Sequence, residues 1–307
     1  MNKELLKLKI KEICPKAKKY EFYKNAIVYK DDSGKKHVIK ECDFNVLETY
    51  NYLNSRGFGY LPRLEYIDDD VYVYEYVKNT KTPDEQKMSD LVRMDALLHN
   101  KTVYYKDISV DEVKEIYENL SVKINDLYNY YDDVITMIES RIYMSPSEYM
   151  LARNCSMVFN CLNFSRSKLD EWYEIMKNKN KKRLVLLHNN LEPSHLVRSD
   201  ENVLISWDKV SRDLPIYDFI KLYKNNYSDY DFNELYKEYI KHFPLNKEER
   251  MLLFIILFIP PKINFTKKEL ITTMEVSKLC NYLITTDKLF MENEAKNAKE
   301  QNNKVYE

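Results

Sequence analysis

The chain has 307 residues, 44% of them hydrophobic, and it carries 48 Lys and Arg side chains against 49 Asp and Glu. A formal net charge of -1 provides no overall field that would gather nucleic acid or anionic lipid, so neither is an expected partner. Only three glycines are present, which excludes a Walker A loop and a GxGxxG dinucleotide fingerprint, because each needs several glycines for its backbone to approach phosphate.

The first part of the chain is predicted to form a small β-rich lobe. Two strand-like runs, residues 20–30 and 35–41, are joined by the turn sequence Asp-Asp-Ser-Gly. A helix follows, with Asp43 as the expected N-cap, an apolar stripe at helical spacing, and a stop at Gly57. Residues 63–77 add two strands around an acidic turn. These runs give the order β-β-α-β-β, and within residues 1–77 we expect a five-stranded sheet with one helix.

The remainder of the chain, residues 78–291, is predicted to be a larger and mainly helical lobe, since the length exceeds the usual size of a single hydrophobic core. Apolar periodicity predicts helices over residues 87–99, 110–130, 133–142, 147–177, 216–239, 247–258 and 267–289. A strand-rich segment, residues 182–208, interrupts them and contains a hairpin turn at 198–202. Residues 292–307 form a polar tail that we expect to be frayed.

The cysteine spacing and the length of the apolar runs argue against a zinc-knuckle, disulfide-bonded or membrane-spanning protein. The five cysteines are scattered without CxxC spacing, so we expect no zinc knuckle, redox pair or disulfide framework. The longest apolar run, residues 251–259, is about half of what spans a bilayer. We expect a cytoplasmic protein without a membrane partner.

Several polar motifs stand at the ends of predicted strands. In the small lobe, Lys40 closes a strand as "HVIK", and Glu48 lies on the next helix. In the strand-rich segment, "LLHNNLEPSHLV" over residues 186–197 is a buried strand that runs into a His and a polar turn. The sequence "ISWD" over residues 205–208 follows after the hairpin.

In this order the motifs resemble those of the aminoglycoside phosphotransferase and choline kinase group of protein-kinase-like enzymes. Within that group the chain looks most like the spore-coat-associated kinase-like proteins of Gram-positive spore formers. The resemblance implies an α+β, bilobal protein-kinase-like fold, with a small antiparallel β-sheet and one helix in the N-terminal lobe and a larger, mainly α-helical C-terminal lobe. It also implies ATP and Mg²⁺ as cofactors.

The resemblance assigns roles to residues of the small lobe. Lys40 would hold the α- and β-phosphates and form an ion pair with Glu48. Asn25 would lie in the phosphate-facing hairpin, and the backbone of Glu75 and Val77 would meet an adenine edge.

Two further features of the resemblance concern the same cleft. The phosphate-facing hairpin contains no glycine in "FYKN", and the bulky side chains of Phe22 and Tyr23 would crowd a phosphate there. In "RDLPIYDFIKLY", Asp213 and Asp218 match a structural segment of the family, and Asp218 would brace the backbone of the catalytic loop.

The catalytic positions depart from the family's pattern of His-Gly-Asp, four residues, then Asn. His188 is kept, but Asn190 replaces the general base and His195 replaces the magnesium-binding amide. Ser206 stands where the family has its principal magnesium carboxylate. An amide accepts no proton near neutral pH, and a neutral hydroxyl is a poor ligand for Mg²⁺, so the sequence predicts a catalytically impaired pseudokinase.

The competing hypothesis is an active ATP-dependent phosphotransferase that acts on an alcohol or amine with atypical catalytic residues. Asp208, two residues beyond Ser206, would face the same side of a strand and ligate a metal, and Glu192 lies near the loop. A zinc site at His188 and His195 is disfavoured, since their spacing is not that of an HExxH helix. A nucleotide, a small molecule or a protein remains a possible partner, and a spore-coat location rests on resemblance alone.

Overall fold

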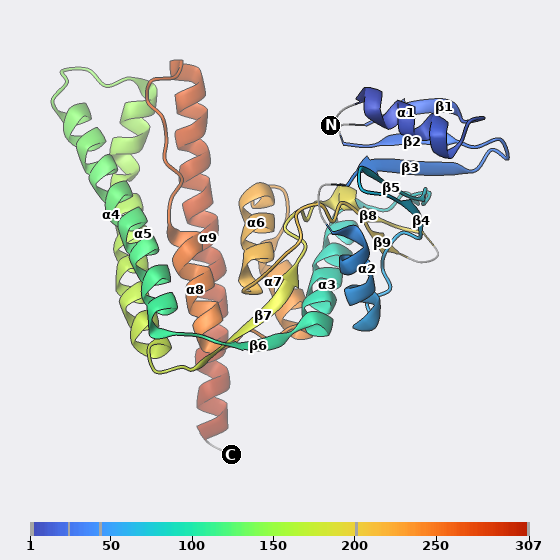
Figure 1. Ribbon diagram of the computed structural model, residues 1–307. Coiled ribbons are helices and arrows are strands. Elements are labelled where there is room, and N and C mark those ends of the chain that lie inside the picture. The colour runs from blue at the N-terminus through green and yellow to red at the C-terminus, as the bar shows by residue number, and fades with distance from the viewer. Residues whose placement is uncertain (1–2, 24, 43–44, 200–201, 306–307) are drawn as a thin grey trace. The chain divides into compact units, whose positions relative to one another are not determined.

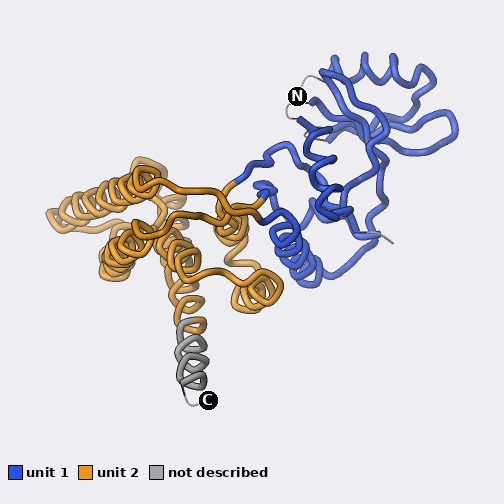
Figure 2. The backbone as a smooth tube through the Cα atoms, turned by 60° about the horizontal axis from the view of Figure 1, so that its bottom comes forward, with its two compact units in different colours: residues 1–103, 186–212 blue, residues 104–185, 213–307 orange. Residues whose placement is uncertain are grey.

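The computed structural model describes residues 3–23, 25–42, 45–199 and 202–305, with side chains up to Asn293. The chain divides into two compact units, shown in Figure 2: unit 1 contains Met1–Val103 and Leu186–Arg212, and unit 2 contains Tyr104–Val185 and Asp213–Glu307. The sequence predicted lobes that are each continuous in the chain, residues 1–77 and 78–291 with a tail at 292–307. The two compact units are instead each built from two separate segments, so the predicted lobes stay a prediction.

Unit 1 contains the predicted five-stranded antiparallel sheet (Figure 1), in the order β1-β2-β3-β5-β4. Its strands are β1 (Lys18–Phe22), β2 (Ile27–Lys30), β3 (Lys36–Glu41), β4 (Leu64–Ile67) and β5 (Val71–Glu75). The sheet and its antiparallel pairing confirm the expectation from sequence. Its register places Lys40 opposite Tyr72.

Each face of this sheet packs against its own apolar cluster, because successive side chains of a strand point to opposite faces. One face carries Ile27, Ile39 and Val73, and it is covered by Leu6 and Ile10 of helix α1 (Lys3–Ile13). This helix precedes the first strand of the sheet and was not predicted from the sequence.

The other face carries Val28 and Val38, and it packs against Val46 and Tyr50 of helix α2 (Val46–Ser55). Since Lys40 lies two residues beyond Val38 on the same strand, it points to this second face.

Helix α2 is capped by a residue other than the one expected. The Asn45 side chain accepts a hydrogen bond from the backbone N–H of Glu48 and is the N-cap. Asp43, the expected cap, lies outside the described residues. Gly57, with φ of +71°, follows the helix as predicted, in a conformation that glycine adopts without steric cost.

The rest of unit 1 consists of helix α3 (Asp84–Thr102), the end of strand β7 (Lys181–Leu187), the short 3₁₀ helix η1 (Pro193–His195), and the hairpin of β8 (Leu196–Val197) with β9 (Val203–Leu204). The hairpin confirms the turn predicted between two apolar runs. Its register pairs Leu196 with Leu204.

Unit 2 is built from long helices. Helices α4 (Val110–Glu139), α5 (Pro146–Met176), α8 (Lys247–Phe258) and α9 (Glu269–Val305) run side by side lengthwise (Figure 1). Each of α4, α5 and α8 begins with a capping box, which fixes where it starts. Strand β6 (Tyr104–Asp107), which was not predicted, pairs with β7, and β10 (Ser211–Asp213) follows the hairpin in the chain.

Apart from shifts of one to three residues at helix ends, the helices differ from the sequence prediction in three places. One helix, α4 (Val110–Glu139), is found where two were expected over 110–130 and 133–142. The segment expected as one helix over 216–239 is instead divided into α6 (Ile216–Asn226) and α7 (Phe232–His242). Asp231 caps α7 through its side chain, and this local signal was missed. The backbone of the polar tail is helical up to Val305, where a frayed tail was expected. None of the described helices is long and apolar enough to cross a bilayer.

An almost fully buried ion pair joins β7 to α8 in unit 2. Arg183 is 11% exposed and Glu249 is 4% exposed, and the guanidinium Nε donates to Glu249 Oε1 at 2.9 Å. A second guanidinium nitrogen donates to Glu249 and to the carbonyl of Pro244 at 2.9 Å, and the group lies 4.3 Å from the centre of the Phe243 ring. Glu249 also accepts from the backbone N–H of Asn246 in the capping box.

Substitution Arg183→Met is expected to lower the free energy of unfolding by about 3–5 kcal/mol, because it leaves the buried carboxylate of Glu249 without a counter-charge. Urea denaturation of the full chain, followed by circular dichroism, measures the change. The matched control is Lys114→Met, which removes an exposed i,i+4 partner of Glu118 and should cost less than about 0.5 kcal/mol. Equal losses in the two variants would contradict a structural role for Arg183.

Candidate functional site

A cavity of about 590 Å³ lies within unit 1, between the second face of the sheet and the loops that surround η1. Val28, Val38 and Tyr74 of the sheet contribute apolar surface to it, together with Val197 and Ile205. The polar residues that line it include six of the residues predicted from sequence to form the site: Asn25, Lys40, Asn190, His195, Ser206 and Asp208.

Lys40 is fixed by an ion pair with Asp208. The ammonium Nζ donates to Asp208 Oδ1 at 2.8 Å, with the two side chains only 8% and 16% exposed. Burial acts to raise the pKa of Asp208, but the hydrogen bond and the positive charge of Lys40 outweigh burial and hold that pKa below its ordinary value. Asp208 is therefore a carboxylate at neutral pH.

The expected ion pair between Lys40 and Glu48 is not formed between these two described residues. The Glu48 side chain is exposed and accepts a hydrogen bond from Asn45 Nδ2 at 2.9 Å, within the N-terminal turn of α2. Lys40 has Asp208 as its partner instead. Lys40 lies near the end of a strand, as predicted. Its counter-charge is Asp208, which lies 168 positions later in the chain.

His188 is a fully buried part of the frame of the site. Its Nδ1 accepts a hydrogen bond from the backbone N–H of Asn190 at 3.3 Å, and its Nε2 lies 3.0 Å from the carbonyl of Ile205. Because an N–H only donates and a carbonyl only accepts, these contacts require a neutral imidazole with its proton on Nε2. The ring also packs edge-on against Trp207, with centroids 4.7 Å apart. His188 thus ties the loop to the segment that follows β9.

The side chain of His195 is hydrogen-bonded to the backbone of Asn190. His195 Nδ1 lies 2.6 Å from the backbone carbonyl of Asn190, so Nδ1 is the donor. The Asn190 side-chain amide reaches the carbonyl of Ser206 at 3.5 Å. His195 lines the cavity, and its Nε2 is the ring nitrogen that takes no part in the hydrogen bond to Asn190.

Two residues of the site adopt a left-handed backbone conformation. Asn189 has φ of +60° and Ser206 has φ of +68°. Asn tolerates this conformation better than most residues with a side chain, so Asn189 can replace the glycine of the family pattern without a change of backbone course. Its side chain donates to Ser211 Oγ at 2.6 Å.

The expectation that Ser206 and Asp208 lie on one side of a strand is wrong. Strand β9 ends at Leu204, Ser206 is left-handed, and Asp208 begins a turn. Both residues line the cavity, but the carboxylate of Asp208 is directed to Lys40.

The donor set of the cavity does not fit Mg²⁺. This ion takes charged oxygen ligands in octahedral geometry. Ser206 offers a neutral hydroxyl, His195 an imidazole, and Asp208 a carboxylate whose charge is balanced by Lys40. Glu192 also lines the cavity, but it is exposed and accepts from the hydroxyl of Ser194 at 3.3 Å.

The hinge residues differ in their relation to the cavity. Val77 lines it, whereas Glu75 is absent from the lining among the described residues, and the Glu75 backbone N–H donates to the carbonyl of Arg63. Tyr23 lines the cavity as expected for a crowding residue. Phe22 lies under the ammonium of Lys7, 4.9 Å from the ring centre, and is not part of the described lining.

Asp213 and Asp218 belong to unit 2. Asp213 ends β10 and accepts from the backbone N–H of Leu214, and Asp218 is fully buried on α6. The brace that Asp218 would give to the catalytic loop stays a prediction. Tyr74, Tyr76 and Lys209 also line the cavity. The sequence reasoning did not single them out, although they stand directly beside Glu75, Val77 and Asp208 in the motifs that it used.

Comparison with known proteins gives matches among solved structures only. No family model and no curated protein matches the sequence. The structure of an aminoglycoside phosphotransferase from Alicyclobacillus acidocaldarius is similar with a TM-score of 0.67, at 12% identity, over 91% of this chain and 93% of that chain. The AMP-bound complex of a spectinomycin phosphotransferase has a TM-score of 0.50, at 12% identity, over 94% of this chain and 93% of that chain.

The sheet of unit 1, the helical unit 2 and the likeness over nine-tenths of both chains agree with the fold expected from the motifs. The structural similarity shows the fold. Because only 12% of the residues are identical, the chemistry has to be argued from the residues of the site. The chain therefore has the α+β, protein-kinase-like fold of the aminoglycoside phosphotransferases.

Proposed function

We propose that the chain is a kinase-like protein that binds a nucleotide or a related small molecule in the unit 1 cavity and is impaired in phosphoryl transfer. The observation that carries the proposal is the buried pair of Lys40 with Asp208, next to an amide at the position of the general base. A nucleotide-type ligand suits the apolar surface of Val28, Val38 and Tyr74, which can accept a flat ring.

The loss of chemistry follows from what the polar groups can do. Asn190 can orient a hydroxyl but cannot remove its proton, and the absence of a general base typically costs on the order of 10²- to 10⁴-fold in rate. Asp208 has its charge balanced by Lys40, so neither residue is free for a phosphate or a cation in this state. Phosphoryl transfer depends almost entirely on positioning and on balancing the phosphate charge.

The alternative is an active phosphotransferase, and one observation favours it. Lys40 is buried at the end of β3 beside an ionised carboxylate, so a nucleotide that drew Lys40 to its phosphates would release Asp208 to bind a cation. The fold neighbours are named as phosphotransferases, and one of them as an AMP-bound complex, which supports a nucleotide as the ligand to test first.

Other features of the proposal rest on the sequence. A protein partner, a cytoplasmic location and an association with the spore coat stay predictions. They would be tested by localisation of the tagged protein in a spore-forming host and by isolation of its complexes.

The first prediction concerns Asp208→Asn. The wild-type chain is expected to bind ADP without help from Mg²⁺, and the variant should bind metal-free ADP roughly tenfold more tightly, because it removes a negative charge near the phosphates and frees Lys40. Thermal-shift titration with and without Mg²⁺ measures the affinities, since a ligand of the native state raises the melting temperature.

The matched control for this prediction is Asp32→Asn, which changes an exposed carboxylate of the same unit outside the described cavity lining. Its ADP affinity should equal that of the wild type. A stabilisation by ADP that requires Mg²⁺ and is lost in Asp208→Asn would instead favour the active enzyme, and the impaired-enzyme proposal would fail.

The second prediction concerns restoration of the missing groups. The triple variant Asn190→Asp, His195→Asn, Ser206→Asp is expected to hydrolyse ATP at least about 10²-fold faster than the wild type, since it replaces the base and the metal ligands. Asp is among the residues that tolerate the left-handed backbone at position 206.

Release of phosphate from ATP in the presence of Mg²⁺ is the measurement, with the triple variant that also carries Lys40→Met as the control. This control should return to the wild-type rate. If the wild type itself turned over ATP faster than Lys40→Met alone, the chain would be a working enzyme and the proposal would be wrong.

A further inference from the structure

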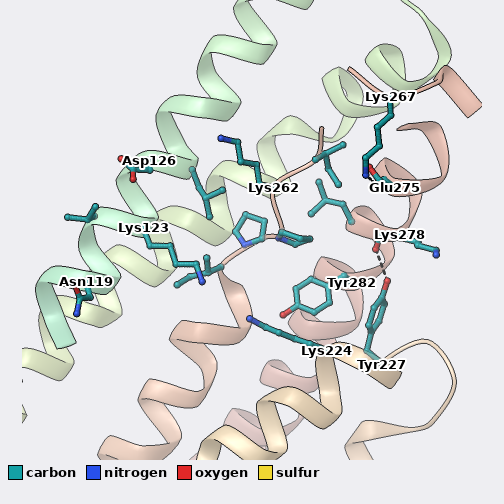
Figure 3. A pocket seen from close by; sticks show the side chains of 17 residues that line it. Asn119, Lys123, Asp126, Lys224, Tyr227, Lys262, Lys267, Glu275, Lys278 and Tyr282 are labelled. Carbon is teal, nitrogen blue, oxygen red and sulfur yellow. Dashed lines mark hydrogen bonds and ion pairs between the residues drawn. The ribbon is translucent and has the colours of Figure 1, made fainter. Parts of the chain in front are cut away.

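A second cavity, of about 780 Å³, lies within unit 2 and is separate from the residues of the kinase-like site. Figure 3 shows its lining, which comes from the middle of α4, the end of α6, the turn after α8, and α9. Its floor is apolar and includes Leu127, Ile259, Ile263 and Leu279, all of them buried in the structure.

The polar residues of this cavity carry an excess of positive charge. Five lysines and two carboxylates line it, although the chain as a whole is nearly neutral. The lysines are Lys123, Lys224, Lys262, Lys267 and Lys278. An excess of one sign in a concave, partly apolar site concentrates the field and attracts an ion of the opposite sign.

Three of these residues are engaged with protein groups. Lys267 forms an ion pair with Glu275 at 2.5 Å, so those two charges balance each other. Lys262 lies 4.2 Å from the centre of the Tyr130 ring. The charge that remains available is therefore centred on the other lysines.

Lys123 and Lys224 are the two lysines that point toward one another across the cavity (Figure 3). Neither has a carboxylate partner among the described residues, and Asp126, the nearest acidic residue along α4, points away from them in the same view. Desolvation, with the positive charge of Lys123 as a second cause, lowers the pKa of Lys224 to about 8. Lys224 as a whole is exposed, so the lowering of its pKa reflects only the protein surface beside it and the positive charge of Lys123.

The aromatic residues complete a mixed surface for a ligand. Tyr227 and Tyr282 lie side by side, with ring centroids 5.1 Å apart, beside the end of Lys224 (Figure 3). The Tyr227 hydroxyl donates to the backbone carbonyl of Lys278, and the Tyr282 hydroxyl donates to that of Leu257. Burial raises the pKa of both phenols, so they stay neutral in the range in which Lys224 titrates.

We propose that this cavity of unit 2 binds a small molecule that joins one anionic group, a phosphate or a carboxylate, to an apolar or aromatic body. The anionic group would lie between Lys123 and Lys224, whose ammonium groups are compact charges with three donors each. The body would lie on the apolar floor and the two tyrosine rings. The inference does not depend on what the unit 1 cavity binds.

The test uses the fluorescent probe anilinonaphthalene sulfonate, which combines an anionic group with aromatic rings. The full chain should bind it, and Lys123→Met with Lys224→Met should weaken binding about tenfold or more, because methionine keeps an apolar stem but removes the charge. The matched control is Lys114→Met with Lys288→Met, which changes the net charge equally on α4 and α9 but outside the cavity lining. The control should bind like the wild type.

The neutral dye Nile red separates charge from apolar contact. Its binding should be the same in all three proteins. Equal affinity for the anionic probe in the cavity variant and the control variant would overturn the proposal, and so would an equal loss of both dyes in the cavity variant, since charge would then not be what recognises the ligand.

Competition distinguishes the two anionic groups. Phenyl phosphate or phenylacetate should displace the anionic probe from the wild type, and the stronger of the two identifies the group that the cavity prefers. Displacement by neither compound would count against the site.

The pH dependence of probe affinity distinguishes binding beside Lys224 from nonspecific binding of the probe to the protein surface. Affinity for the probe should fall between pH 7 and pH 9 as Lys224 loses its proton, and binding near pH 8 should take up a fraction of a proton, because the anion raises the pKa of Lys224. Calorimetry in two buffers of different ionisation enthalpy measures the uptake. Lys224→Met alone should abolish it, and an unchanged uptake in that variant would show that another group is responsible.

Discussion

The contact on which the kinase-like site depends is the ion pair between Lys40 and Asp208. It joins the end of β3 to the turn after β9, two parts of unit 1 that are distant in sequence, and both side chains are almost buried. Taking two charges out of water is costly, so such a pair is stable only when its geometry and its further hydrogen bonds are good. In this pair the ammonium of Lys40, which would face a phosphate, and the carboxylate of Asp208, which would face a metal ion, neutralise each other. The arrangement of the site and the mutual neutralisation of Lys40 and Asp208 therefore have one cause.

Local patterns in the sequence predicted a large part of this architecture. The β-rich composition of "HVIKE" and "VYVYE" located two central strands, and the periodicity of residues 247–258 gave the bounds of α8 as they are found. The order of motifs predicted the fold. Lys40, Asn190 and Ser206 were placed in one cleft because strand ends and the loops beyond them meet in that fold.

Features set by contacts between distant residues were not predictable in this way. The partner of Lys40 was assigned to Glu48, a near neighbour, because nothing in the sequence around Asp208 indicates which cation it meets. The lysines of the unit 2 cavity come from α4, α6, α9 and the turn after α8, and each alone reads as an ordinary exposed lysine. Only their convergence in space gives them a common role.

Helix α1 has a consequence for how the protein is handled. Its two buried residues, Leu6 and Ile10, cover the face of the sheet that carries Ile27, Ile39 and Val73. Trimming this helix to tidy an N-terminal fusion would uncover a flat apolar surface on a five-stranded sheet, and such surfaces drive self-association. A purification tag placed at the opposite terminus leaves that cover intact.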